Sequence, residues 1–577
     1  MDGLLRASTS TGIGRGSGRS DVGYPARAPL NRLNLTRTPL IKHLERGWRL
    51  FGVKGHQAKS VSVWSMKLGV GNAEEESSWN WSCEQKSIVW EADRIARAVD
   101  GEMVKWGNPG RICTDSRKLK KGEWFLALRG PNFDGHEFLQ EVLDRGCAGV
   151  IGQYVSLNWP RGFVRVDCSL QALHRLAAFV RKTYKGMVIG ITGSAGKTTA
   201  RAMTSLALES LGPIHQTAGN LNNHIGLPLT LLSLPTAASA CVLEMGMSAP
   251  GEIQVLAAIA EPSVRVLLNV SCVHMENFKK LEDVALAKGE LLSSAKPGDI
   301  CVLNADDPLV MGLALPPKVN VIFFGKQEGC HVRLVEAHGT RGGRCVSVTL
   351  EQSIRGSVLT EKWSSGFQIW KDLNYVSTRS SVHAELDHRS RVDFEIPSPG
   401  VHLALNACAA ATVAVALGIP LDIVSGSLVK FSPVGMRCKL EQVGDILLIN
   451  DAYNSNPSSL ESGLRSLSSI MCHGRKIAFL GDMLELGTIS AGAHVDALRL
   501  CRELEVDFVG LVGTHFAQAA KSLDFHADSL IICRDCTELA GFVTEIVASG
   551  DVILVKGSRG MKMELIADAI KSGSVSS

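Results

Sequence analysis

A glycine-rich segment between an apolar strand and a helix constrains this chain more than any other feature of its sequence. The segment Gly190-Ile-Thr-Gly-Ser-Ala-Gly-Lys-Thr-Thr199 continues the strand-like run 187–191 and opens a helical pattern over residues 200–211. Glycines let backbone N–H groups close around phosphate oxygens, and the helix N-terminus adds its dipole. The usual phosphate-loop pattern fails at one position, because it requires glycine where this chain has Ile191. The context nevertheless favours a phosphate loop over an ordinary glycine-rich turn.

Two side chains of this loop suit ATP and magnesium. Lys197 can reach the β and γ phosphates, and the Thr198 hydroxyl can hold Mg²⁺. We therefore expect a nucleotide site formed by Gly193, Ser194, Ala195, Gly196, Lys197, Thr198 and Thr199.

Alternating strand-like and helical patterns predict an α/β protein of three domains, since 577 residues exceed what one core organises. Apolar runs recur at 240–244, 264–269 and 300–304, and again at 446–450, 476–480, 508–512 and 552–555. Such alternation predicts mostly parallel sheets covered by helices. We expect a small α/β domain at 86–184, a central domain at 185–434 and a Rossmann-like domain at 435–577. The polar, β-branched stretch 326–398 favours an antiparallel extension.

Basic charge is concentrated at the N-terminus. Residues 1–72 hold twelve Lys or Arg and three acids, so this segment carries +9 and the rest of the chain −5 of the total +4. An acidic body gives no support for a nucleic-acid surface. Residues 1–85 are rich in Ser, Thr, Arg and Gly and lack the apolar core of a secretory signal. We expect an organellar transit peptide, plastid before mitochondrion, with an untargeted tail as the alternative.

The fifteen cysteines are scattered without a repeating spacing, which is typical of reduced thiols. The close pair Cys533 and Cys536 lacks a second pair, so it gives little support for a metal or redox site. The most apolar stretch, 401–418, contains His402 and Asn406 and is too short to span a membrane. We expect a buried helix there, no membrane span, and a monomer.

The phosphate loop and the segments after it resemble the Mur ligase family. The loop Thr192-Gly-Ser-Ala-Gly-Lys-Thr198 is similar to that family's ATP loop, and other similar segments follow in order over nearly all of residues 110–570. They include Gly219 to Pro228, Glu244-Met-Gly-Met, Asn269 to His274, Ala287 to Glu290 and Asn304 to Pro308. The resemblance implies a UDP-binding N-terminal domain, a central P-loop-type ATPase domain and a C-terminal Rossmann-like domain.

The resemblance also implies a metal site for two Mg²⁺ ions. Its ligands would be Thr198, Glu244, His274 and a carbamylated Lys288. An unmodified ammonium would repel magnesium, whereas a carbamate is an anion, so charge complementarity favours the modification. The alternatives are ordinary solvated or hydrogen-bonded side chains for Glu244 and His274 and a helix-surface lysine at 288.

Further residues would contact the nucleotide by the same resemblance, namely Asn304, His402 and Asp451, with Arg437 reaching the γ-phosphate. One departure lies at Leu403, where the family commonly has a residue that supports adenine. Apolar packing of Leu403 on the base is the replacement we expect.

Motifs in the first and last predicted domains narrow the choice within the family. They are Thr114 to Arg117, Asn450 to Pro457, Gly481 to Gly487 and Val555 to Glu564. They resemble the branch that joins D-alanyl-D-alanine to a UDP-N-acetylmuramoyl tripeptide through an acyl phosphate, in peptidoglycan precursor synthesis. Its substrates would contact Ser116, Arg117, Asn222, Asn223, Tyr453, Asn454, Asn456, Lys556 and Arg559. Alternatively, Thr114-Asp-Ser-Arg117 is a surface turn and Arg559 a structural ion-pair residue. The rival functions are a Mur-type ligase for another substrate, such as folate and glutamate, and an organellar scaffold without turnover.

Overall fold

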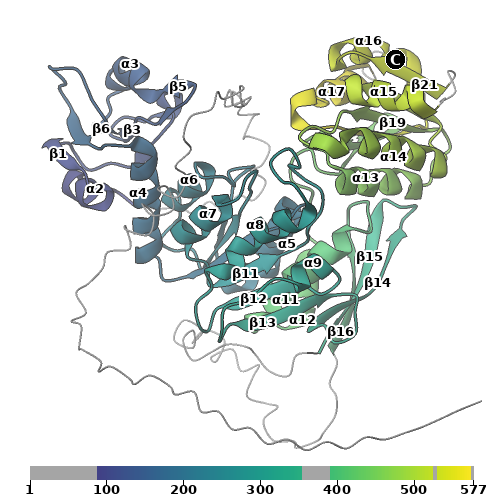
Figure 1. Ribbon diagram of the computed structural model, residues 1–577, viewed down its shortest axis with the longest axis horizontal. Helices are drawn as coiled ribbons and strands as arrows, with labels where there is room; N and C mark the ends of the chain where they lie inside the picture. The colour runs from purple at the N-terminus through teal and green to yellow at the C-terminus, as the bar shows by residue number, and fades with distance from the viewer. Residues whose placement is uncertain (1–87, 354–389, 524–528, 574–577) are drawn as a thin grey trace, which may run out of the picture. The chain divides into compact units, whose positions relative to one another are not determined.

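The computed structural model describes residues 88–353, 390–523 and 529–573 (Figure 1). The predicted leader, residues 1–85, and residues 354–389 of the predicted antiparallel extension lie outside the described residues. The described chain forms sheets of five, nine and six strands and one two-stranded ribbon. Each of the three large sheets falls within one of the three predicted domain ranges, whose boundaries stay predictions.

The N-terminal sheet has the strand order β1-β7-β6-β3-β2, in which only the edge strand β1 runs antiparallel to its neighbour. Its strands are β1 Glu102–Lys105, β2 Ile112–Cys113, β3 Trp124–Leu126, β6 Gly149–Gly152 and β7 Gly162–Arg165; β4 Arg129–Gly130 and β5 Phe133–Asp134 form the ribbon. The helices are α2 Ala92–Val99, α3 Leu139–Asp144 and α4 Ser169–Thr183, with short 3-10 turns at Ser116–Lys118 and Gly135–Phe138.

The central sheet has the order β16-β15-β14-β13-β12-β11-β8-β10-β9. All its neighbours from β9 to β14 pair in parallel, and β14, β15 and β16 pair antiparallel. The predicted parallel sheet and its antiparallel extension are therefore confirmed over the described residues. The strands are β8 Met187–Thr192, β9 Ile214–Gln216, β10 Ala240–Glu244, β11 Val264–Leu267, β12 Ile300–Asn304, β13 Asn320–Gly325, β14 Val332–Thr340, β15 Cys345–Gln352 and β16 Ser390–Ile396.

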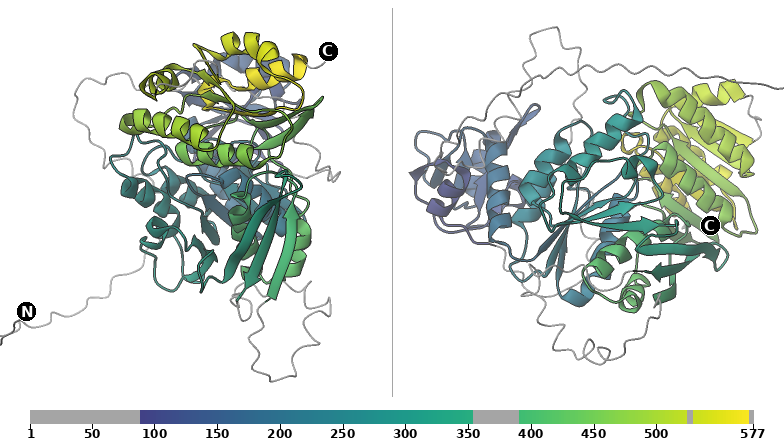
Figure 2. Two further views of the ribbon diagram at one scale, coloured as in Figure 1. Left: turned by 90° about the vertical axis from the view of Figure 1, so that its right-hand side faces the viewer. Right: turned by 60° about the horizontal axis from the view of Figure 1, so that its bottom comes forward.

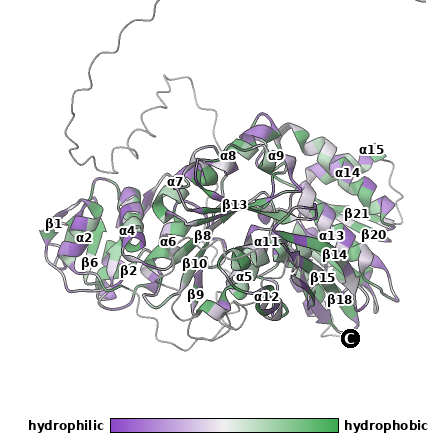
Figure 3. Ribbon diagram, turned by 90° about the horizontal axis from the view of Figure 1, so that it is seen from below, coloured by the Kyte–Doolittle hydropathy of each residue, from purple (hydrophilic) through white to green (hydrophobic). Residues whose placement is uncertain are grey.

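Helices cover both faces of this sheet. They are α5 Lys197–Ala207, α6 Gly226–Leu232, α7 Glu252–Ala260, α8 Leu281–Ser293, α9 Pro308–Met311, α11 Leu403–Ala416 and α12 Leu421–Leu428. Successive residues of a strand point to opposite faces, so in β10 Cys241 and Leu243 pack with α7 and α8, whereas Ala240 and Val242 pack with α5, α11 and α12. Burial on both faces explains why the central strands β8, β10 and β12 are buried along their whole length and mostly apolar (Figure 3).

Helix α11 is the buried helix predicted at 401–418, and nearly all of its residues are buried. Of the helices in the described part of the chain, none combines the length and the apolarity needed to cross a membrane.

The C-terminal sheet has the order β17-β18-β22-β19-β20-β21 and is parallel except for the edge strand β17. Helices α13 to α15 pack on one face, and α16 and α17 on the other (Figure 2). The elements are β17 Lys439–Val443, β18 Ile446–Asp451, α13 Pro457–Ser469, β19 Lys476–Gly481, α14 Ser490–Glu503, β20 Phe508–Val512, α15 Thr514–Leu523, β21 Leu530–Cys533, α16 Cys536–Ile546, β22 Val552–Lys556 and α17 Glu564–Gly573. This is the predicted Rossmann-like layering.

A buried ion pair ties β11 of the central sheet to the turn that follows α8. Arg265 is 1% exposed and Asp299 5%, and Arg265 Nη1 lies 2.7 Å from Asp299 Oδ2. Removing one partner leaves an uncompensated buried charge, so we expect Asp299→Ala to lower the free energy of unfolding by about 3–5 kcal/mol, measured by denaturant titration. The exposed pair Arg499 and Asp496 is the control. Arg499→Ala should change the same free energy by about 0.5 kcal/mol or less, and equal losses would contradict the expectation.

Candidate functional site

The predicted phosphate loop joins β8 to α5. Gly196 has φ +80°, a backbone conformation that favours glycine, and a Cβ there would lie 2.4 Å from Asn406 Oδ1 and displace that side chain. Ile191 lies inside β8 and is fully buried in the core beneath α5. The position where the strict pattern requires glycine is therefore a core strand position in this chain.

The loop is braced by Asn269, which follows β11. The N–H of Ser194 donates to the Asn269 carbonyl at 3.0 Å, and the N–H of Ala195 donates to Asn269 Oδ1 at 2.9 Å. These two N–H groups are used within the protein. The first intrahelical acceptor of α5 is the Gly196 carbonyl, which receives the Ala200 N–H. The N–H groups of residues 196–199 at the helix N-terminus are thus the phosphate donors we expect.

Two lysines meet at the Gly193 carbonyl. Lys197 Nζ lies 2.8 Å from this oxygen and Lys288 Nζ 3.1 Å from it. Burial lowers the pKa of Lys197, and burial together with the charge of Lys197 lowers the pKa of Lys288 well below its ordinary value. Lys288 is 1% exposed on α8, so the alternative of a helix-surface lysine is wrong.

Glu244 ends β10 beside the loop, and both of its carboxylate oxygens accept hydrogen bonds. Thr198 Oγ1 donates to one oxygen at 2.8 Å, and Asn222 Nδ2 donates to the other at 2.7 Å. Burial raises the pKa of the Glu244 carboxyl, whereas nearby cations lower it and prevail. These cations are Arg437, Lys197 and Arg201. Glu244 is 1% exposed and hydrogen-bonded through both oxygens, so of the two alternatives the solvated side chain is wrong for it and the hydrogen-bonded one agrees with the structure.

The donors around Glu244 suit a hard cation. A carboxylate and a threonine hydroxyl are oxygen ligands of the kind that Mg²⁺ prefers, usually together with phosphate oxygens and water. No group of three His, Cys, Asp or Glu side chains within residues 88–353, 390–523 and 529–573 could hold a metal by itself. The residues fit magnesium bound jointly with a nucleotide.

His274 meets a residue that the sequence did not single out. Its Nδ1 lies 2.5 Å from Oε2 of Glu485, which follows β19. This hydrogen bond lowers the pKa of Glu485. His274 and Glu485 have φ values of +53° and +64°, both in the left-handed region. The contact fixes Nδ1 and leaves Nε2 of His274 as the nitrogen free to bind a metal.

A cavity of about 680 Å³ adjoins the loop, which is a size typical of a nucleotide site. Its wall includes Ala195, Gly196, His402 and Asn406, and burial lowers the pKa of His402. The apolar part of the wall comes from Val401, Leu405 and β14. Leu403 is 3% exposed and packs in the core. The expectation that Leu403 packs on the base is therefore wrong, because its position on α11 turns it inward.

Several predicted contact residues have structural partners. Asn304 donates from Nδ2 to the Leu268 carbonyl at 2.8 Å. Asn223 Oδ1 accepts from the N–H groups of Ile225 and Gly226, and Asn456 caps α13 by accepting from the Ser459 N–H. Arg559 Nη1 lies 3.1 Å from Glu564, so the ion-pair alternative is confirmed. The nucleotide role of Asn304 and the substrate roles of Asn223, Asn456 and Arg559 stay predictions.

Asp451 and Lys556 form a pair at the ends of β18 and β22. Lys556 Nζ donates to Asp451 Oδ2 at 2.6 Å and to the Asn454 carbonyl at 2.9 Å, and Lys556 is 2% exposed. Asp451 Oδ1 accepts from the Cys438 N–H at 3.1 Å. These hydrogen bonds hold in place the chain segments that carry Arg437 and Tyr453.

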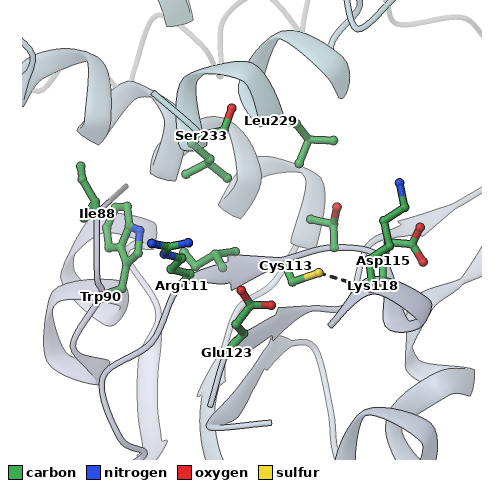
Figure 4. A pocket seen from close by; sticks show the side chains of 12 residues that line it. Ile88, Trp90, Arg111, Cys113, Asp115, Lys118, Glu123, Leu229 and Ser233 are labelled. Atoms are coloured by element: carbon green, nitrogen blue, oxygen red, sulfur yellow. Dashed lines mark hydrogen bonds between the residues drawn. The ribbon is translucent and has the colours of Figure 1, made fainter. Parts of the chain in front are cut away.

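A second pocket, of about 320 Å³, lies between the N-terminal sheet and α6 (Figure 4). Trp90, Arg111, Cys113, Asp115 and Glu123 face Leu229 and Ser233 across it. Arg117 folds onto Asp115, with Nε and Nη2 each 2.9 Å from a carboxylate oxygen. Ser116 is buried, and neither Ser116 nor Arg117 is among the lining residues. The structure therefore shows the Asp-Ser-Arg turn that the sequence offered as the alternative, and this turn lies beside the pocket.

Known proteins show the same domains. Residues 191–414 match the family described as Mur ligase middle domain, and residues 436–559 match the family described as Mur ligase, glutamate ligase domain. The UDP-N-acetylmuramoyl-tripeptide--D-alanyl-D-alanine ligase of Bacillus subtilis (strain 168) is 32% identical over 469 residues, covering 80% of this chain and 93% of the relative. The enzyme of the same name from Escherichia coli (strain K12) is 29% identical over 468 residues, with the same two shares.

Solved structures agree. A crystal structure of MurF from Acinetobacter baumannii has a TM-score of 0.71 and 27% identity, covering 84% of this chain and 99% of that chain. MurF ligase from Thermotoga maritima in complex with ADP has a TM-score of 0.66 and 27% identity, covering 81% and 98%.

Proposed function

This chain belongs to the Mur ligase family, and from that membership we propose that it joins D-alanyl-D-alanine to a UDP-N-acetylmuramoyl tripeptide at the expense of ATP, in peptidoglycan precursor synthesis. One observation carries the proposal. The buried Glu244 carboxylate accepts a hydrogen bond from the Thr198 hydroxyl, and beside it Lys197 and Lys288 both donate to the Gly193 carbonyl of the phosphate loop. A carboxylate and cations gathered at a phosphate loop are suited to phosphoryl transfer.

The chain's own residues stabilise charge rather than form covalent bonds. The N–H groups of residues 196–199 hold the phosphates. Lys197 and Arg437 neutralise the charge that develops as the tripeptide carboxylate attacks the γ-phosphorus of ATP, the bond to the bridging oxygen breaks and ADP leaves. The dipeptide amine then attacks the resulting acyl phosphate, and phosphate leaves. Thr198, Glu244 and His274 would hold Mg²⁺, which supplies further neutralisation of the phosphate oxygens.

Lys288 is the residue we propose to be carbamylated. Burial and the charge of Lys197 lower its pKa well below the ordinary value, which favours the neutral amine, the form that reacts with CO₂. The amine nitrogen bonds to the carbon of CO₂ and releases a proton, which leaves a carbamate anion. Within the described ranges, no carboxylate forms an ion pair with Lys288. The carbamate would therefore replace a costly buried cation with an anion suited to a metal site.

The location is also a proposal. The basic composition of residues 1–72, with three acids and many hydroxyl side chains, supports import into a plastid. We propose that the ligase acts there as a monomer.

The test is phosphate release by the full chain with Mg²⁺ and ATP. We expect release only when both the UDP-N-acetylmuramoyl tripeptide and D-alanyl-D-alanine are present, with the ligated pentapeptide detected by mass spectrometry. Release with a different acid and amine pair would identify another Mur-type ligase. Nucleotide binding without turnover on any pair would show a scaffold and overturn the proposal.

A further inference from the structure

We infer that Tyr453 is a positioning residue that holds the guanidinium of Arg437 in place for phosphoryl transfer. The guanidinium carbon of Arg437 lies 3.9 Å from the centroid of the Tyr453 ring. A cation this close to an aromatic face is attracted by the ring quadrupole. The inference rests on the proposed function and assigns to Tyr453 a role toward Arg437 rather than toward the substrate.

The backbone on both sides of Arg437 is tied to the chain that follows β18. The Tyr453 N–H donates to the Met436 carbonyl at 3.1 Å, and the Cys438 N–H donates to Asp451 Oδ1 at 3.1 Å. Gly435 and Cys438 have φ values of +58° and +54°, so two left-handed residues bracket the segment. These features fix the backbone position of Arg437. They do not restrict the rotatable bonds of its side chain, which another contact must order.

The ring supplies that hold without using the hydrogen-bond donors of Arg437. Within the described ranges, the Arg437 side chain forms no ion pair with a carboxylate. Its guanidinium contacts the face of the Tyr453 ring. A carboxylate partner would occupy the N–H groups, whereas an aromatic face binds the planar cation and leaves the N–H edge free. The free edge is what a phosphoryl group needs.

The charge of Arg437 acts on the phosphate loop. The positive charge of Arg437 interacts with the Glu244 carboxylate and with the Lys197 side chain. Arg437 is therefore held where it faces the residues that surround the terminal phosphate.

Arg559 provides an internal comparison. Its guanidinium carbon is 5.9 Å from the same ring, at the limit of the interaction, and it has its own partner in Glu564. The Tyr453 ring should therefore be coupled more strongly to Arg437 than to Arg559.

A double-mutant cycle tests the coupling. Tyr453→Leu removes the ring, and we expect kcat to fall about tenfold, with a change of less than about twofold in the KM for D-alanyl-D-alanine. Tyr453→Phe keeps the face and should recover most of the lost rate. In the Arg437→Gln background, Tyr453→Leu should cost less than about twofold. The same tenfold loss in both backgrounds, or an equal loss for Phe and Leu, would overturn the inference.

A spectroscopic readout separates this inference from the proposed function. The chain has five tyrosines, so ring ¹³C labelling of the full chain gives five signals, and Tyr453→Phe identifies one of them. Arg437→Gln should shift the Tyr453 signal beyond its line width and leave the other four in place, and Arg559→Gln should shift it less. If Arg437→Gln shifts the Tyr453 signal but the wild-type chain has no two-substrate turnover, only the proposed function is refuted. Normal turnover without the shift would refute only the role of Tyr453.

Discussion

Replacement of Lys197 by alanine is expected to lower phosphate release at least about 10²-fold to 10³-fold, as the loss of one preorganised charge at a transferring group does elsewhere. Lys197 Nζ lies 2.8 Å from the Gly193 carbonyl in a loop whose Ser194 and Ala195 N–H groups donate to Asn269. The substitution removes the side chain that neutralises the phosphoryl charge, while the nucleotide-binding loop keeps the hydrogen bonds that hold it in place. The measurement is ADP and phosphate release with both substrates saturating.

Lys185→Ala is the matched control. Lys185 is exposed and lies two residues before β8, so its loss removes a positive charge from the same part of the chain without touching the loop. We expect its rate to stay within about twofold of wild type, which corresponds to the small effects usual for surface substitutions. Circular dichroism should show both variants folded. A folded Lys197→Ala variant with the wild-type rate would exclude the phosphate-transfer role of the loop.

The core strands could be predicted because they are buried on both faces. The runs 240–244, 300–304 and 508–512 coincide with β10, β12 and β20, since each is five residues of nearly unbroken apolar sequence. The strands β14 to β16 could be predicted only as a region. Their burial alternates or breaks at a register shift, and pairing between distant strands leaves no local pattern.

The phosphate loop could be predicted for a different reason: its chemistry is local. The strand, the glycines, Lys197 and Thr198 are all contiguous, so their roles follow from spacing alone. The contact between His274 and Glu485 joins residues 211 positions apart and arises only when two domains fold. The inward direction of Leu403 likewise depends on how α11 packs, which no spacing reveals. Long-range contacts set the parts of the site that sequence reasoning missed.

Replacement of Lys288 by alanine is the second change expected to have a large effect, with turnover lowered at least about 10²-fold. Burial and the charge of Lys197 lower the pKa of Lys288, which favours the neutral amine that reacts with CO₂. Removal of CO₂ and bicarbonate should depress wild-type turnover reversibly. Lys288→Ala should not respond to bicarbonate, and a small carboxylate such as acetate should restore part of its rate by placing an anion in the vacated space.

The modification has a readout besides the rate. Full chain equilibrated with ¹³C-bicarbonate should show a carbamate carbon signal that disappears in Lys288→Ala and on acidification, because protonation of the amine reverses carbamate formation. Lys296→Ala is the control, since Lys296 follows α8 with 61% of its side chain exposed, and it should keep both the signal and the response to bicarbonate. A Lys288→Ala variant with undiminished turnover would exclude the lysine from the site. A wild-type rate indifferent to CO₂, without a carbamate signal, would show that Lys288 acts as an unmodified amine.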